Sequence, residues 1–443
     1  MNAPARSLPT HAPQTVFAIA DGELQIAGQP LSRLAARVGR TPFYACDRGA
    51  IARRVAELRA ALPPAIELHY AMKANPMPAL VGHLARLVDG IDVASAGELQ
   101  VALDASAAPQ HVSFAGPGKR DTELRQAVAA GILVNVESFR EIAPLAEAAA
   151  ALGVPARVAV RVNPDFELKS SGMKMGGGPK PFGVDAEQVP GLLAEISRAG
   201  LAFEGFHLFA GSQNLKAEAI VEAQRKSFEL ALRLAAHAPA PVRTLNLGGG
   251  FGIPYFPGEQ RLDLAPIGEN LQGLVERAAR EMPQASLVIE LGRYFVGEAG
   301  VYVTRVVDRK VSRGQVFLVT DGGLNSQVVT VTTDVLISIS PGGGSGGNPT
   351  DSGTGTVDPG NGSGGGNPTD PGNGGNPGDN PPGDPTGPGT AIPNNPPAMP
   401  VVANPPNSET TESETNEAPE VTVVDVGQES SVIETLFQAV MPR

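Results

Sequence analysis

The sequence predicts an α/β chain whose main body is a closed (β/α)8, TIM-like barrel. From Thr41 to about Val296, short apolar runs that end in Gly, Asn, Asp or Ser alternate with helical stretches rich in Ala, Leu, Glu and Arg. Such alternation indicates parallel strands joined by right-handed crossovers. About eight or nine of these units fit into roughly 250 residues, which favours a closed barrel over an open sheet.

Nine segments are expected to be strands because each is a short apolar run bounded by turn residues. They read TPFYACD (41–47), IELHYAMKA (66–74), GIDVAS (90–95), HVSFAG (111–116), ILVNVES (132–138), RVAVRVNP (157–164), FEGFHLFAGS (203–212), RTLNLGGG (243–250) and SLVIELG (286–292). The stretches between them, such as 48–62 and 217–238, carry apolar residues at helical spacing. Polar residues gather at the strand ends, where a barrel of this kind holds its active site.

The two flanks of the barrel predict a second, all-β domain of which only part is visible. Residues 17–28 form a hairpin pattern around Asp21-Gly22, and residues 300–323 are β-rich with a turn near 312–314. These two flanks are expected to pair. The expected domains are therefore an N-terminal segment contributing to the β-domain (1–40), the barrel (41–296) and a partial β-domain (297–340).

The remaining chain has a different composition. Residues 341–420 consist mainly of Gly, Pro, Asn, Thr, Ser and Asp, which cannot bury enough apolar surface to offset chain entropy, so a disordered linker is expected. The last segment, 421–443, carries a capping-box pattern at Ser431 and Glu434 followed by an apolar stripe. It is interpreted as a short helix, marginal unless it docks on another surface.

Charge and cysteine content exclude several classes of protein. The net charge is −12, but residues after Asn325 carry fourteen acidic side chains and one basic residue, Arg443, so the first 325 residues hold 33 basic and 32 acidic side chains. A balanced body of this kind is not a nucleic-acid-binding surface. One cysteine, Cys46, excludes a disulfide framework and a multi-cysteine metal site, so no metal is expected.

The absence of apolar targeting segments predicts a soluble, cytoplasmic protein without a membrane partner. The N-terminal stretch has no unbroken apolar run of the kind a signal peptide contains. No window approaches the roughly 18 apolar residues of a membrane helix. A single cysteine also fits a reducing cytosol.

Lys73 stands at the end of an apolar strand in LHYAMKANP (68–76). Taken alone, it is most simply a strand-end lysine whose stem covers apolar surface. Desolvated at a barrel mouth, however, it would have a lowered pKa and could form a Schiff base with an aldehyde. A phosphate-bearing cofactor of this type also needs backbone N–H donors for its phosphate and an acid at its ring nitrogen.

Three other strand ends supply residues of these kinds. The glycines at 248–250 allow close approach of an anion, although a tight turn without a ligand is an equal alternative. Gly211 and Ser212 form a second small, polar strand end. Glu290 and Arg293 follow the last strand, either as an ordinary salt-bridged pair or as the partner of a ring nitrogen and a charge near a phosphate or carboxylate.

Six of these pieces occur together, and with them the body resembles a known family. They read YAMKAN (70–75), DVASAGEL (92–99), RVNPD (161–165), GSQ (211–213), GGGFG (248–252) and ELGRY (290–294). Residues 15–323 resemble the ornithine/diaminopimelate/arginine family of pyridoxal-phosphate-dependent decarboxylases, which has the alanine-racemase-type fold. The segment 170–184 is similar to a subgroup associated with exosortase and exopolysaccharide gene systems. Some relatives of that subgroup act on carrier-linked amino acids.

The resemblance implies pyridoxal 5′-phosphate as the cofactor and decarboxylation of a diaminopimelate-like, ornithine-like or carrier-linked amino acid as the reaction. It implies that Lys73 forms the Schiff base. The other implied roles are Asp92 near Lys73, Arg161 on the side of the ring oxygen, Ser212, Gly248, Gly249 and Gly250 on the phosphate, and Glu290 at the ring nitrogen. The family often stacks a histidine on the ring; Phe209 stands at that place, and His207, two residues earlier, is equally well a core histidine.

The resemblance ends near Leu324. In the family, the second domain continues with a loop that carries a cysteine and an acid into the partner subunit's site, and later with a tyrosine near the phosphate. Neither is recognisable in this sequence, so the homodimer that the family implies would lack a donated part of its site. We therefore expect the chain to hold the cofactor but to decarboxylate poorly or not at all.

Three other interpretations stay open at this point. In the first interpretation the chain is an amino-acid racemase, although the sequence around Lys73 and the GSQ motif favour decarboxylation. Alternatively, it is a non-catalytic pyridoxal-phosphate-binding scaffold. A third interpretation is that the join near residue 324 is an accident of gene fusion or assembly.

Overall fold

A computed structural model describes residues 12–166, 173–174, 178–313, 315–322, 330–331, 335–339 and 433–436 of the chain. In residues 173–174, 312, 315–317, 330–331, 335–339 and 433–436 it describes the backbone alone. The linker expected at 341–420 lies outside the described residues.

The main body is a closed barrel of eight parallel strands, which confirms the predicted fold class. In sheet order the strands are β9 (Arg157–Asn163), β12 (Ala202–Leu208), β14 (Thr244–Gly249), β15 (Ser286–Leu291), β5 (Ile66–Ala71), β6 (Gly90–Val93), β7 (Val112–Phe114) and β8 (Leu133–Val136). The pairing of β8 with β9 closes the circle. A ninth short strand, β11 (Val184–Asp185), pairs with β9, and β10 (Met173–Lys174) pairs with β13 (Gly211–Ser212).

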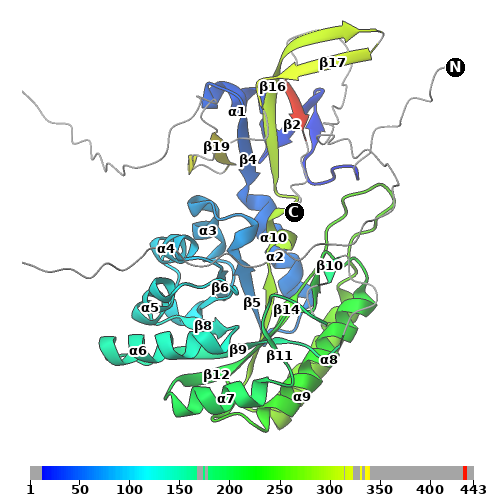
Figure 1. Cartoon of the computed structure of the whole chain (residues 1–443). Helices are drawn as coiled ribbons and strands as arrows, with labels where there is room; N and C mark the ends of the chain where they lie inside the picture. The colour runs from blue at the N-terminus through cyan, green and yellow to red at the C-terminus, as the bar shows by residue number, and fades with distance from the viewer. Residues whose placement is uncertain are drawn as a thin grey trace, which may run out of the picture. The chain divides into compact units, whose positions relative to one another are not determined.

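Helices lie around the barrel strands (Figure 1). They are α2 (Arg48–Ala61), α3 (Pro78–Leu84), α4 (Ala96–Asp104), α5 (Asp121–Ala130), α6 (Ile142–Leu152), α7 (Val189–Arg198), α8 (Ala217–Ala235), α9 (Ala265–Glu281) and α10 (Arg293–Val296), with 3-10 turns η1 (Met72–Ala74), η2 (Pro109–His111) and η3 (Phe139–Glu141). Apolar residues of strands and helices share one buried core, and burial of that area is the main force that closes the barrel.

The first expected strand does not belong to the barrel. Residues Phe43–Asp47 form β4, which pairs with β16 (Gly300–Ser312) and β19 (Val335–Ile339) in a separate antiparallel sheet. The prediction that 41–47 is a barrel strand is therefore wrong. An apolar strand pattern gives no information about which sheet a strand joins, because both sheets bury the same kind of residue.

The second sheet contains the expected hairpin near 312–314. Its strand order is β17 (Gln315–Thr320), β16, β4, β19 and β18 (Thr330–Val331). Strands β16 and β17 pair from Ser312↔Gln315 onward, and Arg313 adopts a positive φ of 51° in the turn.

The N-terminal hairpin forms as predicted but does not pair with β16 in the described part of the chain. Strands β1 (Ile19–Ala20), β2 (Glu23–Ile26) and β3 (Gln29–Pro30) make a small sheet of their own, and α1 (Leu31–Val38) follows. Asp21 and Gly22 both have positive φ, which suits a tight two-residue turn. Ile26 and Leu34 nevertheless share a buried cluster with Val301 and Val303 of β16, so the hairpin joins the second sheet through packing.

The helix expected within 421–443 does not form at residues 433–436, the part of that segment that the structure describes. Residues Ile433–Leu436 form strand β20, which pairs antiparallel with β16 from Arg305↔Ile433 to Tyr302↔Leu436. A short segment with a helical stripe does not form a stable helix by itself, because helix nucleation is unfavourable. The unpaired backbone groups of β16, in contrast, offer hydrogen bonds to an added strand.

Two features are absent from the part of the chain that the structure describes. None of its helices is both long and apolar enough to cross a membrane. The described residues also contain no group of three or more histidine, cysteine, aspartate or glutamate side chains placed to hold a metal ion.

Candidate functional site

The predicted site residues lie on six consecutive strands of the barrel. Arg161 is on β9, His207 on β12, Gly248 and Gly249 on β14, Glu290 on β15, Lys73 directly after β5, and Asp92 on β6. All stand at or beyond the middle of their strands, toward the carboxyl ends, so the barrel gathers them at one mouth. Neighbouring strands lie about 4.8 Å apart, which explains how residues far apart in sequence meet.

Lys73 and Glu290 form the centre of the site. Lys73 Nζ lies 3.7 Å from Glu290 Oε1, and while the lysine side chain is 59% exposed, the glutamate is only 5% exposed. Lys73 Nζ also lies 5.9 Å from the centre of the Phe209 ring. The ammonium group therefore reaches into the open mouth of the barrel, with a buried carboxylate behind it and an aromatic ring beside it.

Glu290 is held as a carboxylate. Burial alone would raise its pKa, but Lys73, His207 and Arg161 outweigh that effect and keep the pKa well below its usual range. His207 Nε2 lies 3.1 Å from Glu290 Oε2, and Asn246 on β14 donates to the same oxygen at 3.4 Å. A permanently charged acid at the base of the mouth is suited to hold a proton on a basic ring nitrogen.

The glycines at 248–250 are required by close backbone approaches. A Cβ on Gly249 would lie 2.2 Å from the carbonyl oxygen of Glu290, and one on Gly250 would lie 2.2 Å from that of Gly211. Gly248 and Gly250 also have positive φ values of 70° and 75°. The 248–250 turn therefore packs directly against the 211–212 strand end that carries Ser212, and together they form a cradle of small residues.

We expect Gly250→Ala to destabilise the protein, because the added methyl group clashes with backbone and the left-handed conformation strains an alanine. The expected loss is about 2 kcal/mol in the free energy of unfolding, measured by urea titration. Gly118→Ala is the matched control, since a Cβ there meets nothing within 4 Å. Equal stability of the two variants would contradict the cradle geometry.

Arg293 lies next to this cradle. Its guanidinium donates to Gln213 Oε1 at 3.1 Å and lies 5.5 Å from the centre of the Tyr255 ring. Gln213 has a positive φ of 55° and its side chain is tied to Ile253 by hydrogen bonds in both directions. The position of Arg293 is thus fixed from two sides, as an anion-binding arginine requires.

Asp92 belongs to a buried polar chain across strands β5 to β8. His69 Nδ1 lies 3.1 Å from Asp92 Oδ1, and the Ser113 hydroxyl donates to the same oxygen at 2.5 Å. Asn135 donates in turn to Ser113 at 3.2 Å. The other oxygen, Asp92 Oδ2, is buried without a hydrogen-bond partner in the described residues, and Asp92 pairs in register with Ala71, two residues before Lys73.

The His69–Asp92 pair predicts a pH dependence of stability. Burial would lower the pKa of His69, but Asp92 and Glu67 outweigh it and raise the pKa to about 10. An unfolded histidine has a pKa of about 6.5. The stability that charged His69 contributes is therefore fully present below pH ~6.5 and lost as the pH rises toward ~10. In urea titrations, the stability difference between wild type and His69→Gln should shrink over this window; a constant difference would contradict the charged pair.

Arg161 is held by a buried charge network. Its guanidinium donates to Glu137 Oε1 at 3.0 Å, and Glu137 also accepts from the backbone N–H groups of Gly116 and Gly183. Lys119, which is almost fully buried, pairs with Glu141 at 3.1 Å. Burial would raise the pKa of Glu137, but Arg161 and Lys119 outweigh it and lower the pKa, so Arg161 faces a carboxylate.

These features fit pyridoxal phosphate. The 248–250 turn carries no side chains, so its backbone N–H groups could approach a phosphate closely. His207 Nδ1 and Asp92 Oδ2 are buried polar atoms without hydrogen-bond partners in the described residues, and such atoms normally mark a missing ligand or water. Lys73, Glu290 and Phe209 supply an amine, an acid and a flat face around one space.

Several residues of this mouth were not singled out from the sequence. They are His69, Ser113, Lys119, Asn135, Glu137, Gln213 and Asn246. A signal did exist, because four of them, His69, Ser113, Asn135 and Asn246, are polar residues within otherwise apolar strands. That pattern alone cannot tell a functional polar residue from one satisfied inside the core.

The chain is similar to known decarboxylases. Residues 48–297 match the family described as "Pyridoxal-dependent decarboxylase, pyridoxal binding domain". The chain is 38% identical over 292 residues to the L-glutamyl-[BtrI acyl-carrier protein] decarboxylase of Niallia circulans, covering 64% of this chain and 67% of that protein. It is 36% identical over 311 residues to the diaminopimelate decarboxylase of Aquifex aeolicus, covering 70% and 72%.

A solved structure shows the same fold. The diaminopimelate decarboxylase of Helicobacter pylori, complexed with L-lysine, has 29% sequence identity to this chain and a TM-score of 0.59. The match covers 67% of this chain and 74% of that one.

Proposed function

The chain belongs to the family of pyridoxal-dependent decarboxylases, and we propose that it removes the α-carboxyl group of an amino acid at the barrel mouth around Lys73. The observation that carries this proposal is the position of Lys73 Nζ, 3.7 Å from the buried Glu290 and beside Phe209. The substrate is proposed to be either a small amino acid of the diaminopimelate or ornithine type or an amino acid attached to a carrier.

The residues present have distinct tasks. When bound, pyridoxal phosphate supplies an aldehyde that reacts with amines and a ring that accepts the electron pair left by CO2. Lys73 would hold the cofactor covalently. Glu290 would keep a proton at the ring nitrogen, because its own pKa is held low. The backbone N–H groups of the 248–250 glycines and the hydroxyl of Ser212 would donate hydrogen bonds to the phosphate. Arg293 would balance the charge of the phosphate.

The remaining polar residues would orient the substrate and cofactor. Arg161, fixed by Glu137, would lie on the side of the ring oxygen. Asp92, fixed by His69 and Ser113, would lie near Lys73. His207 contacts Glu290 and Phe209 would cover one face of the ring. Preorganised groups of this kind lower a barrier because they need not rearrange during the reaction.

The assembly and location are also proposals. We propose a homodimer, as the resemblance implies, and a cytoplasmic location, which the single cysteine supports. Size-exclusion chromatography with light scattering would test the dimer.

The experiment adds pyridoxal phosphate to the purified chain, reduces with borohydride and maps the modified lysine by mass spectrometry. We expect a phosphopyridoxyl group on Lys73, and CO2 release from at least one amino-acid or carrier-linked substrate. Modification spread over exposed lysines such as Lys310, with none at Lys73, would overturn the proposed site.

The same preparation separates the other interpretations. Cofactor on Lys73 with racemisation but no CO2 would indicate a racemase. Cofactor on Lys73 without any turnover would indicate a binding scaffold. The weak turnover expected from the sequence stays a prediction, which the CO2 assay tests.

A further inference from the structure

A file of three polar side chains runs along strands β5 and β6 toward the barrel mouth. It consists of Glu67 and His69 on β5 and Asp92 on β6, and we call it the polar file. Glu67 stands near the amino end of its strand, with a side chain that is 36% exposed. His69 and Asp92 are buried. Because Asp92 pairs in register with Ala71, two residues before Lys73, the polar file leads from the surface at the foot of the barrel to the proposed site.

The geometry around His69 selects the charged form of its imidazole. Its Nδ1 lies 3.1 Å from Asp92 Oδ1, and its Nε2 lies 3.8 Å from Glu67 Oε2. A neutral imidazole carries an N–H group on only one of these nitrogens, whereas an imidazolium carries one on both. A carboxylate beside each nitrogen therefore favours the imidazolium. Burial would lower the pKa of His69, but the two acids outweigh it and raise the pKa to about 10.

The barrel wall leaves room for this ring at one position. Gly90 on β6 pairs in register with His69. A Cβ added to Gly90 would lie 2.4 Å from His69 Nε2 and 2.7 Å from the carbonyl oxygen of His111. Gly90 does not have a positive φ, so glycine is required there for space and not for backbone conformation. The imidazole ring is thus built into the wall between the two strands.

Charged groups on each neighbouring element were considered as partners of His69. On β5 it is Glu67, whose pKa is lowered chiefly by His69. On β6 it is Asp92, and on η2 it is His111, which acts on Glu67. On β15, Glu290 pairs in register with His69, but its charge is balanced at the centre of the site. Glu67 and Asp92 are therefore the acids that keep His69 charged.

Asp92 has one oxygen engaged and the other left for a ligand. Its Oδ1 faces His69 and accepts a hydrogen bond from the Ser113 hydroxyl at 2.5 Å. Its Oδ2 is buried without a hydrogen-bond partner in the part of the chain that the structure describes. A buried acceptor that stays unpaired is costly, most of all when it is charged. Such an atom normally pairs with a ligand or a water.

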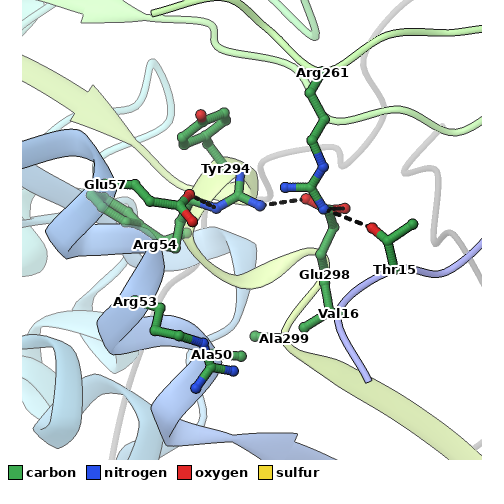
Figure 2. A pocket seen from close by; sticks show the side chains of 11 residues that line it. Thr15, Val16, Ala50, Arg53, Arg54, Glu57, Arg261, Tyr294, Glu298 and Ala299 are labelled. Carbon is green, nitrogen blue, oxygen red and sulfur yellow. Dashed lines mark hydrogen bonds and ion pairs between the residues drawn. The ribbon is translucent and has the colours of Figure 1, made fainter. Parts of the chain in front are cut away.

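The charged cluster of Figure 2 differs from the polar file in this respect. Arg54 lies 2.6 Å from Glu298 and 3.4 Å from Glu57, and Arg261 lies 3.0 Å from the same Glu298. Each of these side chains has an opposite charge beside it, and the cluster joins α2 to the residues that follow α10. Its contacts account for it as a structural feature, whereas Asp92 Oδ2 leaves the polar file open at the mouth.

We propose that His69 is a positioning residue of the proposed reaction: as an imidazolium, kept charged by Glu67, it holds Asp92 by Oδ1 so that Oδ2 accepts a hydrogen bond from an N–H or O–H group of the bound cofactor or substrate. This inference rests on the proposed function, because Oδ2 serves a ligand at the same site. A fixed cation behind Asp92 keeps it a carboxylate, which accepts stronger hydrogen bonds than a neutral group. It also spares Asp92 a rearrangement when the ligand binds.

The test measures the dissociation constant of pyridoxal phosphate by titrating the purified chain between pH ~6 and pH ~9, the range in which an ordinary histidine loses its charge. Each variant is compared with the wild type at the same pH, which removes the titration of the cofactor itself. His69→Gln should weaken binding by about tenfold, as expected when a charged hydrogen-bond partner is lost. This ratio should be the same at every pH, because the wild-type imidazole stays charged throughout.

Glu67→Gln should instead give a ratio that depends on pH. Without Glu67, the pKa of His69 should fall toward its ordinary value of ~6.5. The ratio should therefore be close to one at the acid end and approach that of His69→Gln at the alkaline end. Nitrogen NMR of the histidine side chains, over the same range, reports the protonation of His69 directly. Since Glu67 is partly exposed, this variant should fold even if His69→Gln does not.

Glu57→Gln is the matched control. It removes another partly exposed acid that faces a cation, and it should leave the ratio at one over the whole range. A response equal to that of Glu67→Gln would overturn the inference.

A purely structural His69 predicts a different result. Glu67→Gln would then give the same ratio at every pH, and this outcome would overturn the inference, as would a wild-type His69 that loses its proton near its ordinary pKa. Neither result bears on attachment of the cofactor to Lys73, which mass spectrometry of the reduced wild type decides separately. Absence of that attachment would overturn the proposed function, and this inference with it.

Discussion

Lys73→Ala is expected to abolish covalent attachment of the cofactor and to lower decarboxylation by about 10³-fold or more. The physical reason is that Lys73 is the amine at the barrel mouth, with its Nζ 3.7 Å from Glu290, and removing it leaves the proposed site without its nucleophile. The measurements are CO2 release and mass spectrometry after borohydride reduction.

Lys73→Arg controls for charge. Arginine keeps a cation opposite the buried Glu290 carboxylate but does not provide a free amine, so the fold should be maintained while attachment is lost. Retained attachment or unchanged turnover in either variant would place the chemistry at another residue.

The second large effect is expected for Glu290→Gln. Glutamine keeps the shape of the side chain but cannot hold a proton at a ring nitrogen through its charge, so turnover should fall by about 10²–10³-fold. Attachment of the cofactor at Lys73 should survive, because the amine is untouched. CO2 release and the mass of the reduced protein, measured on the same sample, distinguish the two effects.

Glu290→Asp supplies the matched comparison. The shorter acid keeps the charge facing His207 and Lys73 and should retain more activity than Glu290→Gln. If the two variants lose activity equally, or if Glu290→Gln loses the cofactor as well, Glu290 serves the structure of the mouth and not the ring nitrogen.

The barrel was predictable because its strands and helices alternate with a regular apolar pattern, and the structure confirms eight of the nine expected strands in the closed sheet. The ninth, Phe43–Asp47, joins the second sheet. An apolar pattern indicates that a strand is buried. The strand with which it pairs depends on which sheet offers free hydrogen-bonding groups once the chain has folded.

The proposed site was predictable in its residue types and less so in its contacts. Lys73, Glu290 and the 248–250 glycines stood out because an ammonium, a carboxylate and successive glycines at strand ends are unusual. The partners His69 and Glu137 did not, since each looks like an ordinary polar residue inside a strand. Their roles come from neighbours 23 and 24 residues away in sequence, Asp92 and Arg161.

The sequence by itself determined the barrel, the lysine at its mouth and the chemistry of the groups that surround it, because periodicity and residue type are local properties. Tertiary structure alone decided two other features: the 3.7 Å approach of Lys73 to Glu290 and the low pKa of that acid. Distances, burial and electrostatic coupling arise only when separate strands are brought side by side, and no stretch of sequence contains them.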